Sequence, residues 1–301
     1  MLELSAIVLP DRQPLSAFVA DVRAAEDFGA RTVWTYDHLT WQPLLDRPWH
    51  AAVPLLAAAA MATGRVRLGT QVATPNFRHP VPFAKELMTL DHLSGGRLDL
   101  GVGAGVEGAD AAVLGDRPRT RGERADRFAE WLALLDRLLT QPVTTVRGER
   151  YTAIEARQIP GCVQRPRVPF TVAAAGPRAL RLAARFGQGW VTYGPYGGQR
   201  EPEAWFAALE SQQAALGDAL AEAGRPAGAV RRIAQLALDV TWPFESPGRY
   251  QDTVGRLAAL GFDELTVHWC RRDDGRGVPE TALGFVADAH GHGSPAAESS
   301  A

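Results

Sequence analysis

Asp37 and His38 are the first residues of the chain whose types and spacing could carry acid–base chemistry. They follow the run RTVWTY, which predicts a β-strand, so they stand where a strand gives way to a loop. A histidine takes or gives a proton near neutral pH, and an adjacent carboxylate can orient the imidazole or favour its charged form. The alternative interpretation is structural: Asp37 caps the loop, and His38 packs beside Trp41.

The stretch from Arg65 to Gly105 predicts a strand, a loop, a helix and a second strand. Apolar residues recur at helical spacing between Pro80 and Leu93, and the second strand ends in glycines that alternate from Gly101 to Gly105. Such a segment forms a right-handed parallel crossover, which brings the loops after both strands to one edge of the sheet, where α/β proteins bind ligands. The glycines either let the backbone approach a flat ring or only permit tight packing.

The run AAAGPR at 173–178 ends one predicted strand and opens a predicted helix, with Pro177 at the first helical position. Free backbone N–H groups at the start of this helix, its dipole and Arg178 would together form an anion site around Gly176. Without an anion, the same run is an ordinary strand-to-helix turn.

Most of the chain repeats this alternation, so that eight predicted strands are interleaved with eight predicted helices. The strands are expected at 2–9, 31–36, 66–72, from 98, 170–175, 189–193, 231–241 and 262–269, and the helices at 14–28, 51–63, 80–93, 121–139, 177–186, 203–223, 247–260 and 278–289. In this length the economical arrangement is a (β/α)8 TIM barrel. An open doubly wound sheet competes, but no glycine-rich dinucleotide turn follows the first strand.

The alternation is interrupted at 141–169, where two short β-like pieces surround Arg147, Gly148 and Glu149. We expect an inserted hairpin there that covers part of the site. A single domain would span 1–290, and the small, polar residues at 291–301 predict a disordered tail.

Composition excludes several classes of function. The net charge of -2 and the lack of a basic stripe argue against nucleic-acid binding. No export leader and no apolar run long enough for a bilayer are evident, so we expect a cytoplasmic protein without a membrane segment. The two cysteines are isolated and the histidines lack ligand spacing, so no metal is expected.

Two long runs carry a resemblance to a known family. GTQVATPNFRHP at 69–80, followed by LDHLSGGRLDLGVGAG at 90–105, resembles the luciferase-like oxidoreductases, the superfamily of bacterial luciferase and its flavin- and deazaflavin-dependent relatives. The resemblance extends from Ala24 to about Trp190. The TPNFR run is close to the pattern of sugar-phosphate dehydrogenases that use coenzyme F420, a deazaflavin, and therefore favours that branch.

The resemblance implies roles at the end of the second predicted strand. His38 would be the catalytic acid or base, Asp37 would lie near the cofactor, and Trp41 would stack in the site, although those dehydrogenases usually have one more residue between His and Trp. A glutamate that donates a proton directly follows their last glycine. Here Val106 occupies that position and Glu107 comes next, so Glu107 is the candidate acid through a shifted loop.

The cofactor contacts implied by the resemblance lie in three backbone segments. In relatives, the loop after the third strand carries a non-proline cis peptide that supports the cofactor ring, and the equivalent bond joins Gln71 and Val72. The glycine-rich strand end and the AAAGPR turn would contact the ring and hold the cofactor phosphate. The implied contacts are Thr70, Gln71, Val72, Gly103, Ala104, Gly105, Ala174, Ala175, Gly176, Pro177 and Arg178.

The implied function is hydride transfer between coenzyme F420 and a small organic substrate. Because Lys85 is the only lysine and no basic cluster stands near the strand ends, a neutral alcohol, ketone or activated alkene is favoured over a sugar phosphate. An FMN-dependent luciferase-type monooxygenase is the alternative, and a non-catalytic ligand-binding barrel is the alternative of another class. The superfamily commonly pairs its barrels, so we expect a homodimer, with the apolar face of 55–61 as a candidate contact.

Overall fold

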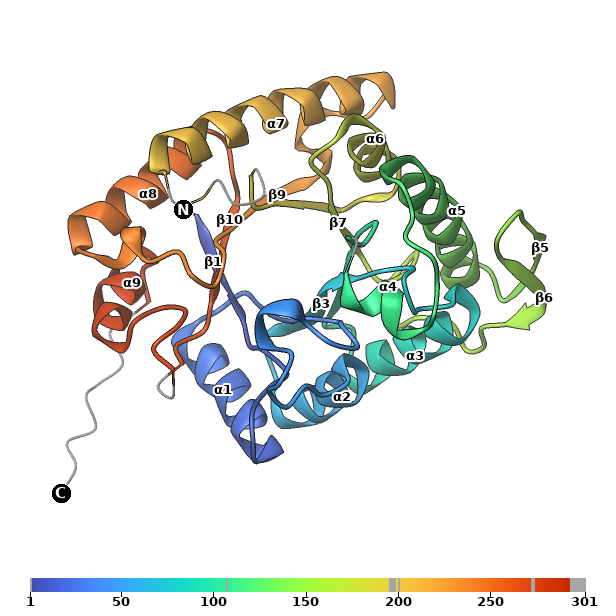
Figure 1. The fold of residues 1–301 in the computed structure, drawn as a ribbon, viewed down its shortest axis with the longest axis horizontal. Helices are drawn as coiled ribbons and strands as arrows, with labels where there is room; N and C mark the ends of the chain where they lie inside the picture. Colours follow the sequence, from blue (N-terminus) through green and yellow to red (C-terminus); the bar gives the residue numbers. More distant parts are fainter. Residues whose placement is uncertain (1, 107, 195–198, 200, 272–273, 293–301) are drawn as a thin grey trace.

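The computed structural model describes residues 2–106, 108–194, 199, 201–271 and 274–292. Eight parallel strands close into a barrel in the order β1-β10-β9-β8-β7-β4-β3-β2, and helices surround it (Figure 1). The strands are β1 (Glu3–Ile7), β2 (Thr32–Thr35), β3 (Arg67–Ala73), β4 (Leu98–Val102), β7 (Phe170–Ala173), β8 (Gly189–Thr192), β9 (Arg231–Gln235) and β10 (Glu264–His268). Because β1 pairs with both β10 and β2, the sheet is closed. The predicted (β/α)8 barrel is confirmed, and the open sheet is excluded.

The helices follow the predicted ranges closely. They are α1 (Leu15–Phe28), α2 (Ala52–Ala62), α3 (Pro80–Leu93), α4 (Ala109–Val113), α5 (Arg121–Thr140), α6 (Pro177–Phe186), α7 (Pro202–Glu222), α8 (Pro247–Ala259) and α9 (Leu283–Ala289). The sequence did not predict α4, a short helix in the loop after β4. None of the helices in the described part of the chain combines the length and apolar character that crossing a bilayer demands.

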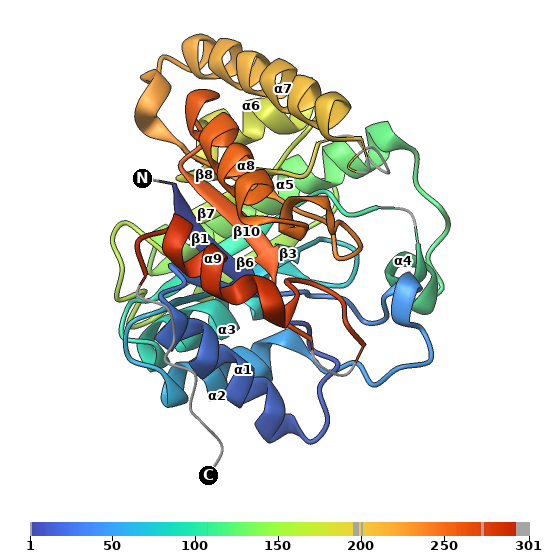
Figure 2. The ribbon, with the colours of Figure 1, turned by 90° about the vertical axis from the view of Figure 1, so that its left-hand side faces the viewer.

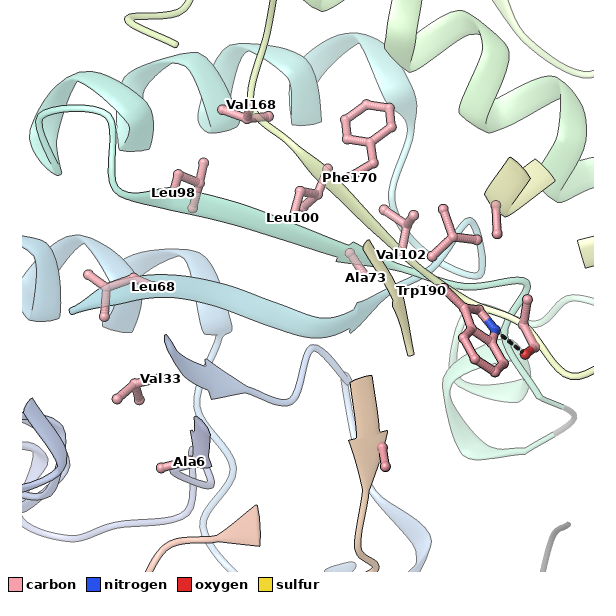
Figure 3. Close-up of a cluster of buried hydrophobic side chains, with 14 of the residues drawn as sticks. Ala6, Val33, Leu68, Ala73, Leu98, Leu100, Val102, Val168, Phe170 and Trp190 are labelled. Atoms are coloured by element: carbon pink, nitrogen blue, oxygen red, sulfur yellow. Dashed lines mark hydrogen bonds between the residues drawn. The ribbon is translucent and has the colours of Figure 1, made fainter. Parts of the chain in front are cut away.

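The barrel wall separates two kinds of core. Outward side chains such as Leu68, Leu100 and Phe170 pack against the helices in a large apolar cluster (Figure 3). Inward positions alternate with these along each strand, because successive side chains point to opposite faces. A smaller separate cluster includes Ile7 and Ile233.

Charged side chains close the amino-terminal end of the barrel. Glu264 at the start of β10 is fully buried, and its Oε2 lies 3.0 Å from Nε of Arg231. Arg231 also donates to Asp99 at 3.0 Å, and Asp99 accepts from Thr171 at 2.9 Å. Burial raises the pKa of Glu264, and the Arg231 charge opposes that shift. These paired charges belong to the base of the fold, which leaves the opposite end for ligands.

The insertion is an antiparallel hairpin of β5 (Val143–Arg147) and β6 (Thr152–Arg157), as predicted. It lies outside the helix layer beside α3 and α5 (Figure 1). Tyr151 accepts a hydrogen bond from Arg127 on α5 at 2.8 Å, and Lys85 on α3 donates to the Arg157 carbonyl at 2.7 Å. The expectation that the hairpin covers part of the site is therefore wrong, because its contacts hold it against the outer helices.

The first two residues of the predicted tail belong to the fold. The His292 amide donates to the Ala287 carbonyl at 2.9 Å, and the His292 ring packs edge-on against Phe28 with centroids 6.1 Å apart. Gly291 and His292 thus still belong to the folded barrel, and the remainder of the predicted tail, 293–301, lies outside the described residues.

Candidate functional site

The loops that follow β2, β3 and β4 start at neighbouring points on the carboxyl end of the barrel. Thr35 pairs with Thr70, and Ala73 pairs with Val102, so the three strands end side by side. The chain order strand, loop, helix places these loops where barrel enzymes assemble their sites. The predicted residues from Asp37 to Trp41 and from Thr70 to Val72 therefore share one end of the barrel.

His38 is held by a carboxylate that the sequence analysis missed. Its Nδ1 lies 2.5 Å from Oδ2 of Asp110, which is buried on α4. The other oxygen of Asp110 accepts from the backbone N–H groups of Leu39 at 2.7 Å and Thr40 at 3.2 Å. Figure 2 shows α4 beyond the barrel wall, on the side to which the loop after β2 projects. Because Nδ1–H donates to Asp110, this hydrogen bond leaves Nε2 as the other ring nitrogen of His38.

The adjacent carboxylate has a different partner. Asp37 is buried and accepts two hydrogen bonds from Arg78, at 2.7 Å to Oδ1 and 3.0 Å to Oδ2. Burial lowers the pKa of Arg78, but the hydrogen bond and charge of Asp37 outweigh that effect and raise it. Asp110 therefore orients the imidazole, and Asp37 ties the loop after β2 to the loop after β3.

Aromatic rings surround His38. Tyr36 lies edge-on to His38 with ring centroids 5.9 Å apart, and edge-on to Trp41 at 5.1 Å. Trp49 lies 5.6 Å from Trp41 and donates its indole N–H to the His38 carbonyl at 3.0 Å. Trp41 is thus part of an aromatic wall beside the histidine, together with Tyr36 and Trp49, which the sequence analysis did not single out.

The end of β3 bulges as the resemblance implied. The peptide bond between Gln71 and Val72 is cis, and the register with β4 shifts between Thr70 and Ala73. A Cβ on Gly101 would lie 2.0 Å from the Thr70 carbonyl oxygen, and one on Gly103 would lie 2.8 Å from the Val72 side chain. Gly101 and Gly103 therefore make room for the bulge, which supports the packing interpretation of these glycines.

The glycine at the end of this segment serves the turn itself. Gly105 has φ +74°, a left-handed conformation that favours glycine, and its missing Cβ would meet the Asn76 amide at 2.7 Å. Ala104 beside it is partly buried against the main apolar cluster. The candidate acid Glu107 lies outside the described residues, so the structure does not place it.

The predicted anion site retains its backbone part. Gly176 is the N-cap of α6. Among the described residues no side chain caps the helix, and apart from the chain neighbours of Gly176 no heavy atom lies within 4 Å of where its Cβ would stand. Trp190 on β8 donates to the Ala174 carbonyl at 2.8 Å, which fixes the turn before the helix (Figure 3). Arg178 instead forms an ion pair with Asp126 on α5. An anion at this turn would therefore be held by the backbone N–H groups of Gly176, Arg178 and Ala179, since Pro177 has none, next to an arginine whose charge is already paired.

No group of three or more metal-ligating side chains occurs among the residues that the structure places. The carboxyl end of the barrel brings together the oriented imidazole of His38, an aromatic wall, a backbone bulge and the start of α6. This combination suits the binding of a planar group that carries an anion, beside a residue that can move one proton.

Comparisons with known proteins agree with this geometry. A 172-residue segment is 42% identical to the F420-dependent glucose-6-phosphate dehydrogenase of Beutenbergia cavernae and covers 56% of this chain and 49% of that protein. Over 176 residues the chain is 34% identical to the F420-dependent hydroxymycolic acid dehydrogenase of Mycobacterium tuberculosis, covering 58% of this chain and 48% of that one. The chain thus spans about half the length of these curated relatives.

Solved structures show the same fold. An F420-dependent secondary alcohol dehydrogenase in complex with an F420-acetone adduct superposes with a TM-score of 0.78 at 16% identity, covering 96% of this chain and 98% of that one. The family model described as luciferase-like monooxygenase matches residues 3–242. The chain therefore belongs to the luciferase-like monooxygenase family.

Proposed function

We propose that this protein is a coenzyme F420-dependent oxidoreductase that transfers a hydride between the deazaflavin and a small organic substrate. The observation that carries the proposal is the buried Asp110 carboxylate on Nδ1 of His38, beside the bulge at Gln71 and Val72. An oriented imidazole next to a ring-supporting bulge matches hydride transfer coupled to one proton transfer. The relatives named above as F420-dependent support the choice of cofactor.

The residues present fit such a cofactor. The bulge at Thr70, Gln71 and Val72 would support the ring, with Asp37 and the segment from Gly103 to Gly105 beside it. The uncapped α6 terminus, from Ala174 to Arg178, has open space at Gly176 and would hold the phosphate. When bound, the deazaflavin supplies hydride chemistry without the ready reaction with oxygen that a flavin shows.

His38 handles the substrate proton in this proposal. In ketone reduction, Nε2–H of the imidazolium donates its proton to the substrate oxygen, and in alcohol oxidation the neutral Nε2 accepts the hydroxyl proton. Asp110 keeps Nδ1 protonated and stabilises the charged ring by a short hydrogen bond. Tyr36, Trp41 and Trp49 present aromatic surface beside the reacting groups, which reduces the access of water.

The substrate is proposed to be uncharged. Arg271, which follows β10, donates to both oxygens of Asp11 at 2.8 Å and also pairs with Asp274. Arg78 is neutralised by Asp37. Since these guanidinium groups at the carboxyl end of the barrel already have carboxylate partners, a neutral alcohol or ketone fits better than a sugar phosphate.

The family model's description favours a second candidate, an FMN-dependent monooxygenase. Titration of the purified protein with F420 and with FMN, followed by protein fluorescence, distinguishes the candidates. We expect F420 to bind in the micromolar range or tighter, and secondary alcohols to reduce bound F420 faster than glucose 6-phosphate does. Preferential FMN binding would support the monooxygenase, and failure to bind either cofactor would support a non-catalytic barrel.

Replacement of Asp110 by Asn tests the orienting carboxylate. The amide oxygen can accept a hydrogen bond from Nδ1–H, but it has no charge to stabilise the imidazolium, and the amide nitrogen would then face the backbone N–H groups of Leu39 and Thr40. We expect Asp110→Asn to lower turnover about 10- to 100-fold, with cofactor affinity unchanged, as measured by steady-state kinetics. Asp116→Asn is the control, because Asp116 pairs with Arg119 in the same loop and is more exposed. Equal turnover in the two variants would contradict the role of Asp110.

The protein is proposed to be a cytoplasmic homodimer. Leu55 and Leu56 are buried in their own barrel, so they are not free for a partner, whereas Met61 is 72% exposed on the outer side of α2. We expect sedimentation velocity at micromolar concentration to give a dimer that Met61→Glu dissociates, because a charge in an apolar contact must be desolvated. A wild-type monomer would overturn the dimer proposal, and a dimer that resists this substitution would place the contact elsewhere than at α2.

A further inference from the structure

A chain of hydrogen bonds crosses the barrel interior below His38. Gln71 Nε2 donates to Gln235 Oε1 at 2.8 Å, Gln235 Nε2 donates to the Tyr36 hydroxyl at 3.2 Å, and that hydroxyl lies 2.9 Å from Nε2 of His268. The four residues come from β3, from β9, from the end of β2 and from β10. Gln71, Gln235 and His268 are 4%, 8% and 2% exposed, so these polar groups depend on one another.

The hydrogen bonds of this chain all point the same way, from donor to acceptor, starting at Gln71 and ending at His268. Because Gln235 accepts from Gln71 through its oxygen, it turns its nitrogen toward Tyr36. Burial raises the pKa of Tyr36, so the phenol keeps its proton and donates it to His268 Nε2. Burial also lowers the pKa of His268 to about 3, with Arg271 acting in the same direction and the Leu236 carbonyl and Asp239 opposing. The histidine is therefore neutral at neutral pH and serves as an acceptor.

The Tyr36 ring connects this chain to the proposed proton-transfer residue. It lies edge-on to His268 at 5.6 Å on one side and to His38 and Trp41 on the other, at 5.9 and 5.1 Å. Edge-on contacts define ring orientation because the positive edge of one ring meets the negative face of the next. Without its hydroxyl group, the ring at position 36 would lose its hydrogen bonds to Gln235 and His268, which fix the ring between His38 and His268.

We propose that Tyr36, Gln235 and His268 are positioning residues, whose hydrogen-bonded chain holds the Tyr36 ring and thereby sets the orientation of His38 and Trp41. The inference rests on the proposed oxidoreductase function. The chain also contains Gln71, whose peptide bond to Val72 is cis, so one network contacts both the bulge and the ring beside His38. His268 moves no proton in this proposal, since it stays neutral and its Nε2 faces Tyr36.

Two tyrosine variants test the proposal as a matched pair. Tyr250, buried on α8, lies 2.8 Å through its hydroxyl from Nε2 of His290, and His290 Nδ1 lies 2.8 Å from the Leu2 carbonyl. This pair is chemically similar and lies in the helix layer. We expect Tyr36→Phe to lower kcat about 10- to 100-fold, with KM and F420 affinity within about 3-fold of wild type. Tyr250→Phe should lower the Tm to a similar degree and leave kcat unchanged.

Two substitutions of His268 separate positioning from proton transfer. The Gln side chain of His268→Gln can still accept the Tyr36 hydrogen bond, so we expect most of the wild-type kcat and an unchanged pH profile. His268→Leu cannot accept that bond, and kcat should fall as in Tyr36→Phe. In the cofactor-free protein, near-UV circular dichroism of the tryptophans should change in Tyr36→Phe and His268→Leu and stay near wild type in His268→Gln and Tyr250→Phe.

The possible results are distinct. Wild-type kcat in folded Tyr36→Phe, or equal losses in the two tyrosine variants, would overturn the positioning role while leaving the proposed function intact. Loss of a limb of the pH profile in His268→Gln would make His268 a proton carrier and would also overturn the proposal. A wild-type protein that binds neither F420 nor FMN would remove the proposed function, and this inference with it.

Discussion

Turnover by His38→Gln should fall about 10²- to 10⁴-fold, the range that a general acid or base contributes. Gln keeps polar atoms near Asp110 and the substrate, but it cannot shuttle a proton at Nε2. F420 affinity should stay within a few-fold of wild type, because the proposed cofactor contacts lie in the bulge and at the start of α6. Steady-state kinetics and a cofactor titration on the same preparation measure both quantities.

His38→Ala extends this test. It removes the side-chain partner of the buried Asp110, which keeps the N–H groups of Leu39 and Thr40. Some stability should therefore be lost, but turnover per folded molecule should resemble that of His38→Gln. His92→Gln is the matched control, since the His92 side chain on α3 forms a hydrogen bond with the Gly161 carbonyl at 2.9 Å, away from the proposed site. Near-normal turnover in folded His38→Gln protein would end the proton-transfer proposal and leave His38 as a packing residue.

The local pattern of apolar and polar residues was sufficient to predict the (β/α)8 barrel. Alternating apolar strands and amphipathic helices, such as Phe83 and Leu87 on α3, appear in the sequence because each element buries one face next to its neighbours in the chain. The bulge at Gln71 and Val72 was predicted from the resemblance to the family, since no local pattern specifies a cis peptide bond. The glycines Gly101 and Gly103 then proved to accommodate that bulge.

The sequence did not predict which side chains from distant parts of the chain form hydrogen bonds or ion pairs with one another. His38 and Asp110 are 72 residues apart, and Asp110 lies on a short helix that no periodicity of apolar residues predicts. Arg178 was expected to contact an anion, and the sequence did not predict that it also pairs with Asp126, 52 residues earlier. A side chain's partner depends on which loops the closed barrel brings together, so the adjacent Asp37 was an obvious but incorrect choice for orienting His38.

Gly176→Asp should weaken F420 binding on the order of 100-fold without weakening the fold. Gly176 has φ −102° and ψ 161°, which any residue can adopt, and open space surrounds its Cβ position. Asp is a favoured N-cap residue, and its carboxylate would accept hydrogen bonds from the free N–H groups in the first turn of α6. The Tm should therefore stay unchanged or rise slightly. The same carboxylate would occupy the proposed phosphate site and repel the phosphate, a like-charge contact that costs several kcal/mol.

Gly176→Asn separates the two effects of that substitution. Asn caps the same N–H groups without a charge, so it competes with the phosphate but does not repel it, and we expect a smaller loss of affinity than with Asp. Raising the salt concentration should narrow the gap between the two variants, because screening weakens only the repulsion. Fluorescence titration with F420, with thermal unfolding of the same samples, gives both quantities. If both variants bind F420 like the wild type, the phosphate does not bind at the α6 terminus.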